Sequence, residues 1–328
     1  MLLAAAVLAA CGGQGTAPDS SLHVCVATNA EGLISHTFNR LAVDGAQQAG
    51  AAVQVVPSRT ASDYVSSLGR CAAARPAVVV AISSDMASAV WRAAQQNPTQ
   101  RFALIDGIPE DDNGHAVDLD NVASVLFNQQ EPGYLVGSLA GYLEKNKVGS
   151  ASHNVLGILG SNHGPKVDPF VAGYIAGARS IDPSAQFKVT YSDSQDAAFC
   201  KQLGINQISA GADILFEVTG RCASGYIDAA YDAGAYAIGS GNDMAYASPA
   251  VITSALERVD KAVVILIHRI QSRQFKSGKD VLSIADDATG FSTPSSVVPQ
   301  EIINQVLEIR ARIRSGAITP PSTIPPGI

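Results

Sequence analysis

Two kinds of segment alternate along the first half of the chain. Short apolar runs are typical of buried strands, and longer stretches in which apolar residues recur every three or four positions are typical of amphipathic helices. The predicted strands cover residues 22–28, 51–58, 77–83, 101–106 and 123–128, and the predicted helices cover 38–49, 62–71, 85–96 and 131–144. The continuous apolar run AVVVAI favours a parallel sheet with helices on both faces.

The same alternation starts again at residue 155. Predicted strands cover residues 155–161, 187–192, 213–219 and 236–241, and predicted helices cover 168–179, 197–210 and 225–233. Two such series in one chain predict an α/β protein with two doubly wound parallel-sheet lobes. Later elements follow, with strands at 250–255 and 280–285 and helices at 257–274 and 300–315. We expect these to cross back between the lobes and form a multi-strand hinge that permits closure.

This organisation gives the expected domains. A chain of 328 residues, 47% of them hydrophobic, is long enough for two cores. Lobe I is predicted to comprise residues 22–125 and 249–284, lobe II residues 126–248 and 285–318, and a Pro-rich tail residues 319–328. Ligands of doubly wound sheets bind beyond the carboxyl ends of the strands, so we expect a ligand where the two lobes face each other.

The chain begins with the apolar segment MLLAAAVLAAC. This run is too short to span a bilayer but fits the apolar core of a secretory signal. The residues before Cys11 resemble a bacterial lipobox, and residues 12–18 fit a flexible tether. We expect an extracytoplasmic protein held at the outer face of the membrane by a lipid on Cys11. No Lys or Arg precedes the run, so we expect the true start to lie upstream; a chance cysteine in an apolar N-terminus is the alternative.

Four further cysteines lie in the predicted mature chain. Outside the cytoplasm such residues tend to pair. Each half of the chain holds one pair, so we predict the disulfides Cys25–Cys71 and Cys200–Cys222. Four buried free thiols are the alternative. Histidine is not spaced near these cysteines in a zinc-binding pattern, so no metal site is predicted.

Charge and motifs exclude several classes of function. A net charge of -7 without a basic block does not favour nucleic-acid binding. The sequence has no G-x-S-x-G elbow, no H-E-x-x-H motif and no phosphate-binding loop, so we expect neither an enzyme nor a cofactor. A transcriptional regulator with the same two lobes would need a DNA-binding unit before Leu22, where only 21 residues are present.

Polar and aromatic residues gather directly after the predicted strands. Each has a structural explanation when taken alone, because Asp and Ser cap helices and Phe is commonly a core residue. Their coincidence at strand ends predicts a ligand site. The candidate ligand-binding residues are Asn29, Ser35, His36, Phe38, Asn39, Asp106, Phe216, Asn242, Asp243 and Glu257. Ser84, Gln129, Lys166 and Glu217 also follow or end strands.

Several segments occur in an order that resembles one protein family. The loop Ser35-His36-Thr37-Phe38-Asn39 takes the place of the usual Asp-Lys-Ser-Phe-Asn of the basic membrane lipoprotein family, the PnrA-like substrate-binding lipoproteins of ABC transporters. Further matching segments are RFALID, NVASVLFNQQEPGYLVGSLAG, FVAGYIAGARSIDP, GADILFEVTG, AIGSGNDMAYASPAVITSALERVDKAV and SGAITPP. The resemblance covers nearly all of the chain after Leu22.

The resemblance implies a type I periplasmic-binding-protein-like fold and a receptor that captures a nucleoside, typically a purine nucleoside, for ABC permease subunits. Two Phe rings clamp the base in such proteins, and the matching residues are Phe38 and Phe216. Stacking suits this task because every base has a π face. Asp106 matches a carboxylate that can accept hydrogen bonds from sugar hydroxyls or from a base N–H.

Several polar positions depart from the family pattern. The family has Asp at Asn29, Asp-Lys at Ser35-His36, Asp at Gly241 and Lys at Glu257. The change at residue 257 replaces a donor-only cation with an acceptor-only anion. A receptor for a sugar or another small polar solute on the same scaffold is therefore the alternative function.

Overall fold

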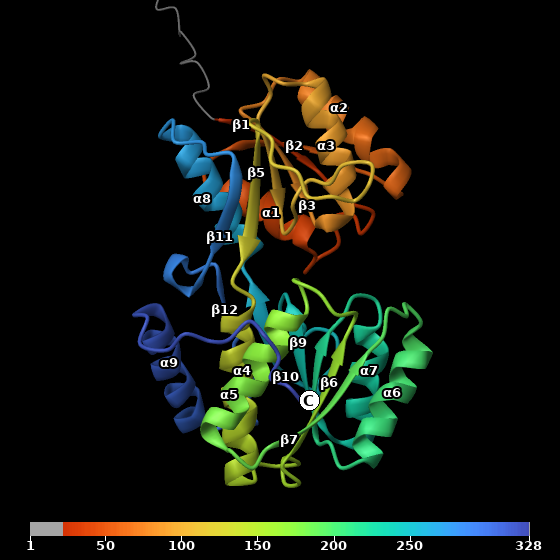
Figure 1. The fold of residues 1–328 in the computed structure, drawn as a ribbon, viewed down its shortest axis with the longest axis vertical. Coiled ribbons are helices and arrows are strands. Elements are labelled where there is room, and N and C mark those ends of the chain that lie inside the picture. The colour runs from red at the N-terminus through yellow and green to blue at the C-terminus, as the bar shows by residue number, and fades with distance from the viewer. Residues whose placement is uncertain (1–21, 328) are drawn as a thin grey trace, which may run out of the picture.

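The computed structural model describes residues 22–327, which form two lobes joined at a narrow junction (Figure 1). The predicted leader, the lipobox at Cys11 and the tether lie outside the described residues. No helix in the described part of the chain is long and apolar enough to cross a membrane.

The first lobe is built on a sheet of six parallel strands. Their order across the sheet is β2-β1-β3-β4-β5-β11. Side chains alternate along β1: Val24 and Val26 face a core under α1 and α8, whereas Cys25 and Ala27 face a core under α2 and α3. The elements are β1 (His23–Ala27), α1 (Phe38–Gln48), β2 (Ala52–Val56), α2 (Tyr64–Ala73), β3 (Val78–Ile82), α3 (Ala87–Gln96), β4 (Phe102–Ile105), β5 (Val122–Phe127), α8 (Val259–Gln271) and β11 (Gly278–Leu282).

The second lobe repeats this arrangement in the order β7-β6-β8-β9-β10-β12. Helices α4, α5 and α9 cover one face and α6 and α7 the other. β12, an edge strand that was not predicted, pairs antiparallel with β10. The elements are α4 (Gln130–Asn146), β6 (Val155–Gly160), α5 (Asp168–Ile181), β7 (Gln186–Tyr191), α6 (Ala197–Ser209), β8 (Ile214–Val218), α7 (Ala223–Ala233), β9 (Tyr236–Gly241), β10 (Val251–Glu257), β12 (Thr289–Phe291) and α9 (Gln300–Arg314).

Three segments of the described chain connect the lobes, as the multi-strand hinge requires. They run from β5 to α4, from β10 to α8, and from β11 to the short 3-10 helix Ile284–Asp286 (Figure 1). The structure differs from the predicted domain division at one strand. Residues 249–284 were assigned to lobe I, but β10 pairs with β9 and therefore belongs to the second sheet. The chain returns to the first lobe only at α8, which packs on α1.

Helices α4 and α5 pack unusually closely because glycines line their contact. Gly133, Gly137 and Gly141 on α4 face the backbone of α5. A Cβ atom added at Gly137 would lie 2.1 Å from the main-chain oxygen of Tyr174. Gly173 and Gly177 on α5 face the backbone of α4 in the same way. The two helices therefore approach at a distance that no larger residue at these positions allows.

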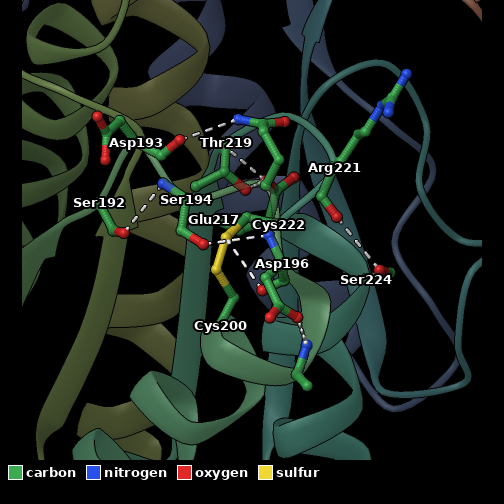
Figure 2. The surroundings of a disulfide bond; sticks show 12 residues. Ser192, Asp193, Ser194, Asp196, Cys200, Glu217, Thr219, Arg221, Cys222 and Ser224 are labelled. Carbon is green, nitrogen blue, oxygen red and sulfur yellow. Dashed lines mark hydrogen bonds between the residues drawn. A yellow bond between two sulfur atoms is a disulfide. The ribbon is translucent and has the colours of Figure 1, made fainter.

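Both predicted disulfides are confirmed. Cys25 of β1 bonds to Cys71 of α2, and Cys200 of α6 bonds to Cys222, which directly precedes α7. Figure 2 shows that the second bond lies beside the loop of residues 192–196 and close to Glu217 at the end of β8. It thus links the start of α6 to the turn before α7 at the carboxyl edge of the second sheet.

Candidate ligand site between the lobes

The carboxyl ends of the strands in both lobes meet at the junction. In each sheet the strand order reverses beside the first strand, between β1 and β3 in one lobe and between β6 and β8 in the other. Loops that leave such a reversal point diverge and leave room for a ligand. The contacts between the lobes come from the loops after β1, β3 and β4 on one side and those after β6 and β9 on the other.

Asn29 and Asn39 fix the shape of the loop after β1. Both side chains are buried. Asn39 Nδ2 donates to Asn29 Oδ1 at 2.6 Å and to the carbonyl oxygen of Gly32 at 2.9 Å, and the main-chain N–H of Asn29 donates to Asn39 Oδ1 at 3.2 Å. These two predicted site residues therefore hold each other and position the exposed turn that carries Ser35 and His36.

Aromatic rings meet across the lobes at this loop. The edge of the Phe38 ring approaches Gly241 of the second lobe, where an added Cβ would lie 3.2 Å from the ring. His36 stacks on Tyr246 with ring centroids 4.5 Å apart and an interplanar angle of 15°. Asn242 Nδ2 donates to the main-chain oxygen of His36. Tyr246 was not predicted as a site residue. The sequence indicates it only by its position in the loop after β9, where ligand-binding residues were expected.

The prediction that Phe216 forms the second wall is wrong for this structure. Its side chain is 0% exposed and stacks on Tyr174 of α5, with centroids 4.5 Å apart. The cause is the alternation of side chains along β8, which directs Phe216 into the core under α4 and α5. Phe38 remains half-buried at the junction, whereas Phe216 faces the interior of its own lobe.

An ion pair joins the lobes at Asp106. Lys166, in the loop after β6, donates from Nζ to Asp106 Oδ2 at 2.6 Å, to the Asp106 carbonyl oxygen at 2.6 Å and to Ser84 Oγ at 3.2 Å. Asp106 has the left-handed backbone angle φ 58°, which places both its carbonyl and its carboxylate near the same ammonium group. Burial raises the pKa of Asp106, and the charge of Lys166 opposes that shift.

Glu257 lies at the hinge, near enough for the charges of Asp106 and Lys166 to act on it. It ends β10, is 4% exposed, and accepts a hydrogen bond from Gln129 Nε2 at 2.8 Å. Burial raises the pKa of Glu257 to about 8, with a further contribution from the negative charge of Asp106. The predicted residues Asp106 and Glu257 are thus brought together, and Lys166 and Gln129 join them.

The remaining candidate residues divide into structural and exposed groups. Glu217 is buried at the end of β8 and accepts from Thr219 N and Oγ1, both at 3.0 Å, and from Ser240 N at 2.9 Å. It therefore fastens β8 to β9, and burial raises its pKa to about 7. Asp243 is exposed and accepts from Ala245 N at 3.1 Å, which shapes the turn before Tyr246.

A hollow of about 600 Å³ lies elsewhere, between β12, the start of α8 and α9. Both arginines that line it are paired: Arg258 bonds to Asp260, and Arg310 to Asp287. None of the predicted ligand-binding residues lines this hollow. Within residues 22–327, no group of three or more His, Cys, Asp or Glu side chains is arranged to hold a metal ion.

Comparison with known proteins agrees with this architecture. A crystal structure of a solute-binding protein of an ABC transporter system from Aeropyrum pernix K1 superimposes with a TM-score of 0.70 at 22% identity, covering 92% of this chain and 94% of the other. The CD4+ T-cell-stimulating antigen of Listeria monocytogenes is 26% identical over 91% of this chain and 87% of its own length. The ABC transporter nucleoside-binding protein BmpA of Lactococcus lactis is 24% identical over 98% of this chain and 96% of its own.

Residues 36–323 match the family model described as ABC transporter substrate-binding protein, PnrA-like (Bmp). The match spans both lobes, all three hinge crossings and nearly every residue discussed at the junction. The chain therefore belongs to the PnrA-like family of ABC transporter substrate-binding proteins.

Proposed function

We propose that this protein is an extracytoplasmic receptor that binds a nucleoside-like solute between its lobes and delivers it to the permease of an ABC importer. A lipid on Cys11 holds it at the outer face of the membrane in this proposal. The relative from Lactococcus lactis is named a nucleoside-binding protein, which supports this class of solute. The family itself consists of substrate-binding proteins, not enzymes.

One observation carries the proposal. An aromatic ring, Phe38, and a set of polar groups, Asp106, Gln129 and Glu257, come from different strand ends yet lie at the same junction between two hinged lobes. A nucleoside needs both kinds of partner, because its base offers a flat apolar face and its sugar offers hydroxyl donors. Closure of the lobes would bring these partners around the solute.

The second aromatic wall is assigned to Tyr246 rather than to Phe216. Tyr246 is exposed, lies on the second lobe and already stacks on a ring of the first lobe. Rotation of the lobes about the hinge would separate His36 from Tyr246 and leave the tyrosine face available to a base. Phe216 would require the core under α5 to open, which is far more costly than a hinge motion.

The test is calorimetric titration of adenosine, guanosine, inosine and cytidine into the wild-type protein and two variants. Phe38→Ala is expected to weaken binding about fivefold or more, because stacking on one ring contributes about 1–3 kcal/mol. Phe275→Ala is the matched control, since Phe275 is also half-buried and packs against the same core cluster of the first lobe. Equal affinity of the wild type and Phe38→Ala for every nucleoside bound would refute the aromatic site.

The lipid anchor has its own test. Mass spectrometry of the mature protein from its native membrane is expected to show an N-terminal Cys11 that carries acyl chains. Cys11→Ala is expected to release the protein from the membrane fraction. Retention of the variant in that fraction would contradict the proposed anchor.

A further inference from the structure

The ion pair at the junction leaves the local charges unbalanced. Asp106 and Glu257 contribute two buried carboxylates, and Lys166 contributes one ammonium group. The three groups act on one another: the charge of Asp106 raises the pKa of Glu257, and that of Lys166 lowers it. Asp85 adds a further negative charge that acts on Asp106. Counting only the two buried carboxylates and Lys166, one positive charge is therefore missing when both carboxylates are ionised.

Lys166 cannot serve both carboxylates fully. Its three N–H donors are matched by three acceptors on the first lobe, namely Asp106 Oδ2, the Asp106 carbonyl and Ser84 Oγ. Glu257 keeps a single neutral partner, Gln129, on Oε1, and we find no hydrogen bond on Oε2 to any residue between 22 and 327. A buried ionised carboxylate with one neutral partner is unfavourable, so without a solute Glu257 holds a proton at neutral pH.

We propose that the solute carries a protonated amino group that binds against Glu257, so that two buried carboxylates face two positive charges in the complex. This inference rests on the proposed solute site between the lobes and specifies the charge of the solute. The ammonium group takes the place of the proton on Glu257, and that proton is released to solvent. The aromatic part of the solute lies toward Phe38, and its amino group lies toward the hinge.

Solutes with other functional groups would leave the charge of Glu257 or Asp106 without a partner. A solute with only hydroxyl groups can donate to Glu257, but it brings no charge and leaves the carboxyl protonated or the pair unbalanced. A solute with a phosphate group would face Asp106, Glu257 and Asp85 and would be repelled. Hydrogen bonds between charged partners are roughly twice as strong as those between neutral ones, so the amino group is favoured over a hydroxyl at the same position.

The test compares matched pairs that differ only in an amino group for a hydroxyl. Adenosine is titrated alongside its 2′-amino-2′-deoxy, 3′-amino-3′-deoxy and 5′-amino-5′-deoxy analogues, and glucose alongside glucosamine, by calorimetry at pH 7.5. We expect at least one amino compound to bind about tenfold more tightly than its hydroxyl partner. Repeating the titration of the 5′-amino compound, the least perturbed alkylamine of the series, in two buffers with different ionisation enthalpies is expected to show net proton release.

Two variants assign the effect to Glu257. Glu257→Gln preserves the shape and can keep the bond from Gln129 but removes the charge, so it is expected to abolish both the amino preference and the proton release. Glu31→Gln removes an exposed carboxylate from the same junction and is expected to keep both effects.

The outcomes separate the inference from the proposed function. If adenosine binds as tightly as all three amino analogues, the nucleoside receptor stands and the charge assignment is wrong. A preference that survives in Glu257→Gln would also overturn it. If no nucleoside binds but glucosamine is preferred over glucose through Glu257, the charge assignment stands and the nucleoside proposal falls. Binding in neither series would contradict both.

Discussion

Lys166 Nζ of the second lobe lies 2.6 Å from Asp106 Oδ2 of the first, so the two lobes are tied together by an ion pair at their strand ends. The carboxylate is almost completely buried, whereas the lysine side chain is 37% exposed. A contact of this kind favours the closed arrangement even without a solute. A solute that binds at Asp106 must either displace the ammonium group or share the carboxylate with it.

The first prediction concerns this tie. Lys166→Met is expected to shift the solute-free protein toward an open arrangement, because Asp106 loses its charged partner and becomes hydrated when the lobes separate. Small-angle X-ray scattering should then show a larger radius of gyration. Lys201→Met is the control, since Lys201 is equally exposed and pairs at 2.6 Å with Asp232 inside one lobe. Identical scattering curves for wild type and Lys166→Met would contradict the role of the ion pair.

The second prediction concerns the close contact of α4 and α5. Gly137→Ala is expected to lower the free energy of unfolding by about 1–3 kcal/mol, because the added methyl group meets the backbone of α5, which cannot move aside without separating the helices. Gly69→Ala is the matched control on α2, where nothing lies within 4 Å of the added atom. There alanine should be neutral or stabilising by up to about 1 kcal/mol. Urea unfolding followed by circular dichroism measures both.

The third prediction concerns the disulfides. They close segments with sequence separations of 46 and 22 residues, so removing either one by a Cys→Ser pair is expected to cost about 3–4 kcal/mol in the chain-entropy description. The double variant Cys200→Ser with Cys222→Ser should in addition loosen the carboxyl edge of the second lobe near Glu217. Hydrogen exchange of residues 192–196 and 219–222 measures that loosening. Unchanged exchange there would show that the hydrogen-bonded turns hold without the disulfide.

The sequence was sufficient for both cysteine pairs and for every long helix and strand, though not for the short edge strand β12, because these features depend on local patterns. Hydrophobic periodicity marks a helix wherever it packs, and a pair of cysteines within one half of the chain has few possible partners. The face of the sheet to which a strand side chain points depends less on the local sequence. Phe216 and Glu217 are adjacent in β8, so their side chains point to opposite faces of the sheet. Phe216 enters the core under α4 and α5, whereas Glu217 accepts a hydrogen bond from Ser240 of β9. That register became visible only when the sheet was assembled.

Lys166 shows a second limit of the sequence. It lies in a polar loop where a solvent-exposed role is the simplest interpretation, and its partner Asp106 is 60 residues away in the other lobe. The incorrect assignment of β10 to lobe I has a similar origin, because a strand next to a hinge can join either sheet without a change in its own sequence. Contacts across the junction depend on how two folded lobes meet, and no periodic pattern records that arrangement.

The last prediction concerns Glu144 of α4 and Asp213 at the start of the segment that forms β8, which are buried together far from the junction. Glu144 Oε2 accepts from Asn154 N at 2.9 Å, and Asp213 Oδ2 accepts from Ser152 N and His153 N at 2.8 and 2.9 Å. Their other oxygens, Glu144 Oε1 and Asp213 Oδ1, accept no hydrogen bond from any N–H or hydroxyl group of the described residues. Burial and the neighbouring Asp213 raise the pKa of Glu144 to about 9, so Glu144 holds a proton at neutral pH and donates it to Asp213.

The pH dependence follows from the direction of this shift. Below pH about 4.5 Glu144 is protonated in both the folded and the unfolded chain, and its contribution to stability is fully present. Between pH 4.5 and pH 9 only the folded chain keeps the proton, so the free energy of unfolding falls by up to about 1.4 kcal/mol for each unit by which the pH rises.

Glu144→Gln supplies a permanent N–H donor to Asp213 and should remove this slope. It is therefore expected to match the wild type near pH 4.5 and to exceed it increasingly up to pH 9. Urea unfolding at several pH values measures the difference, with exposed Glu308→Gln as the control. Parallel curves for the wild type and Glu144→Gln would show that the two carboxyl groups do not share a proton.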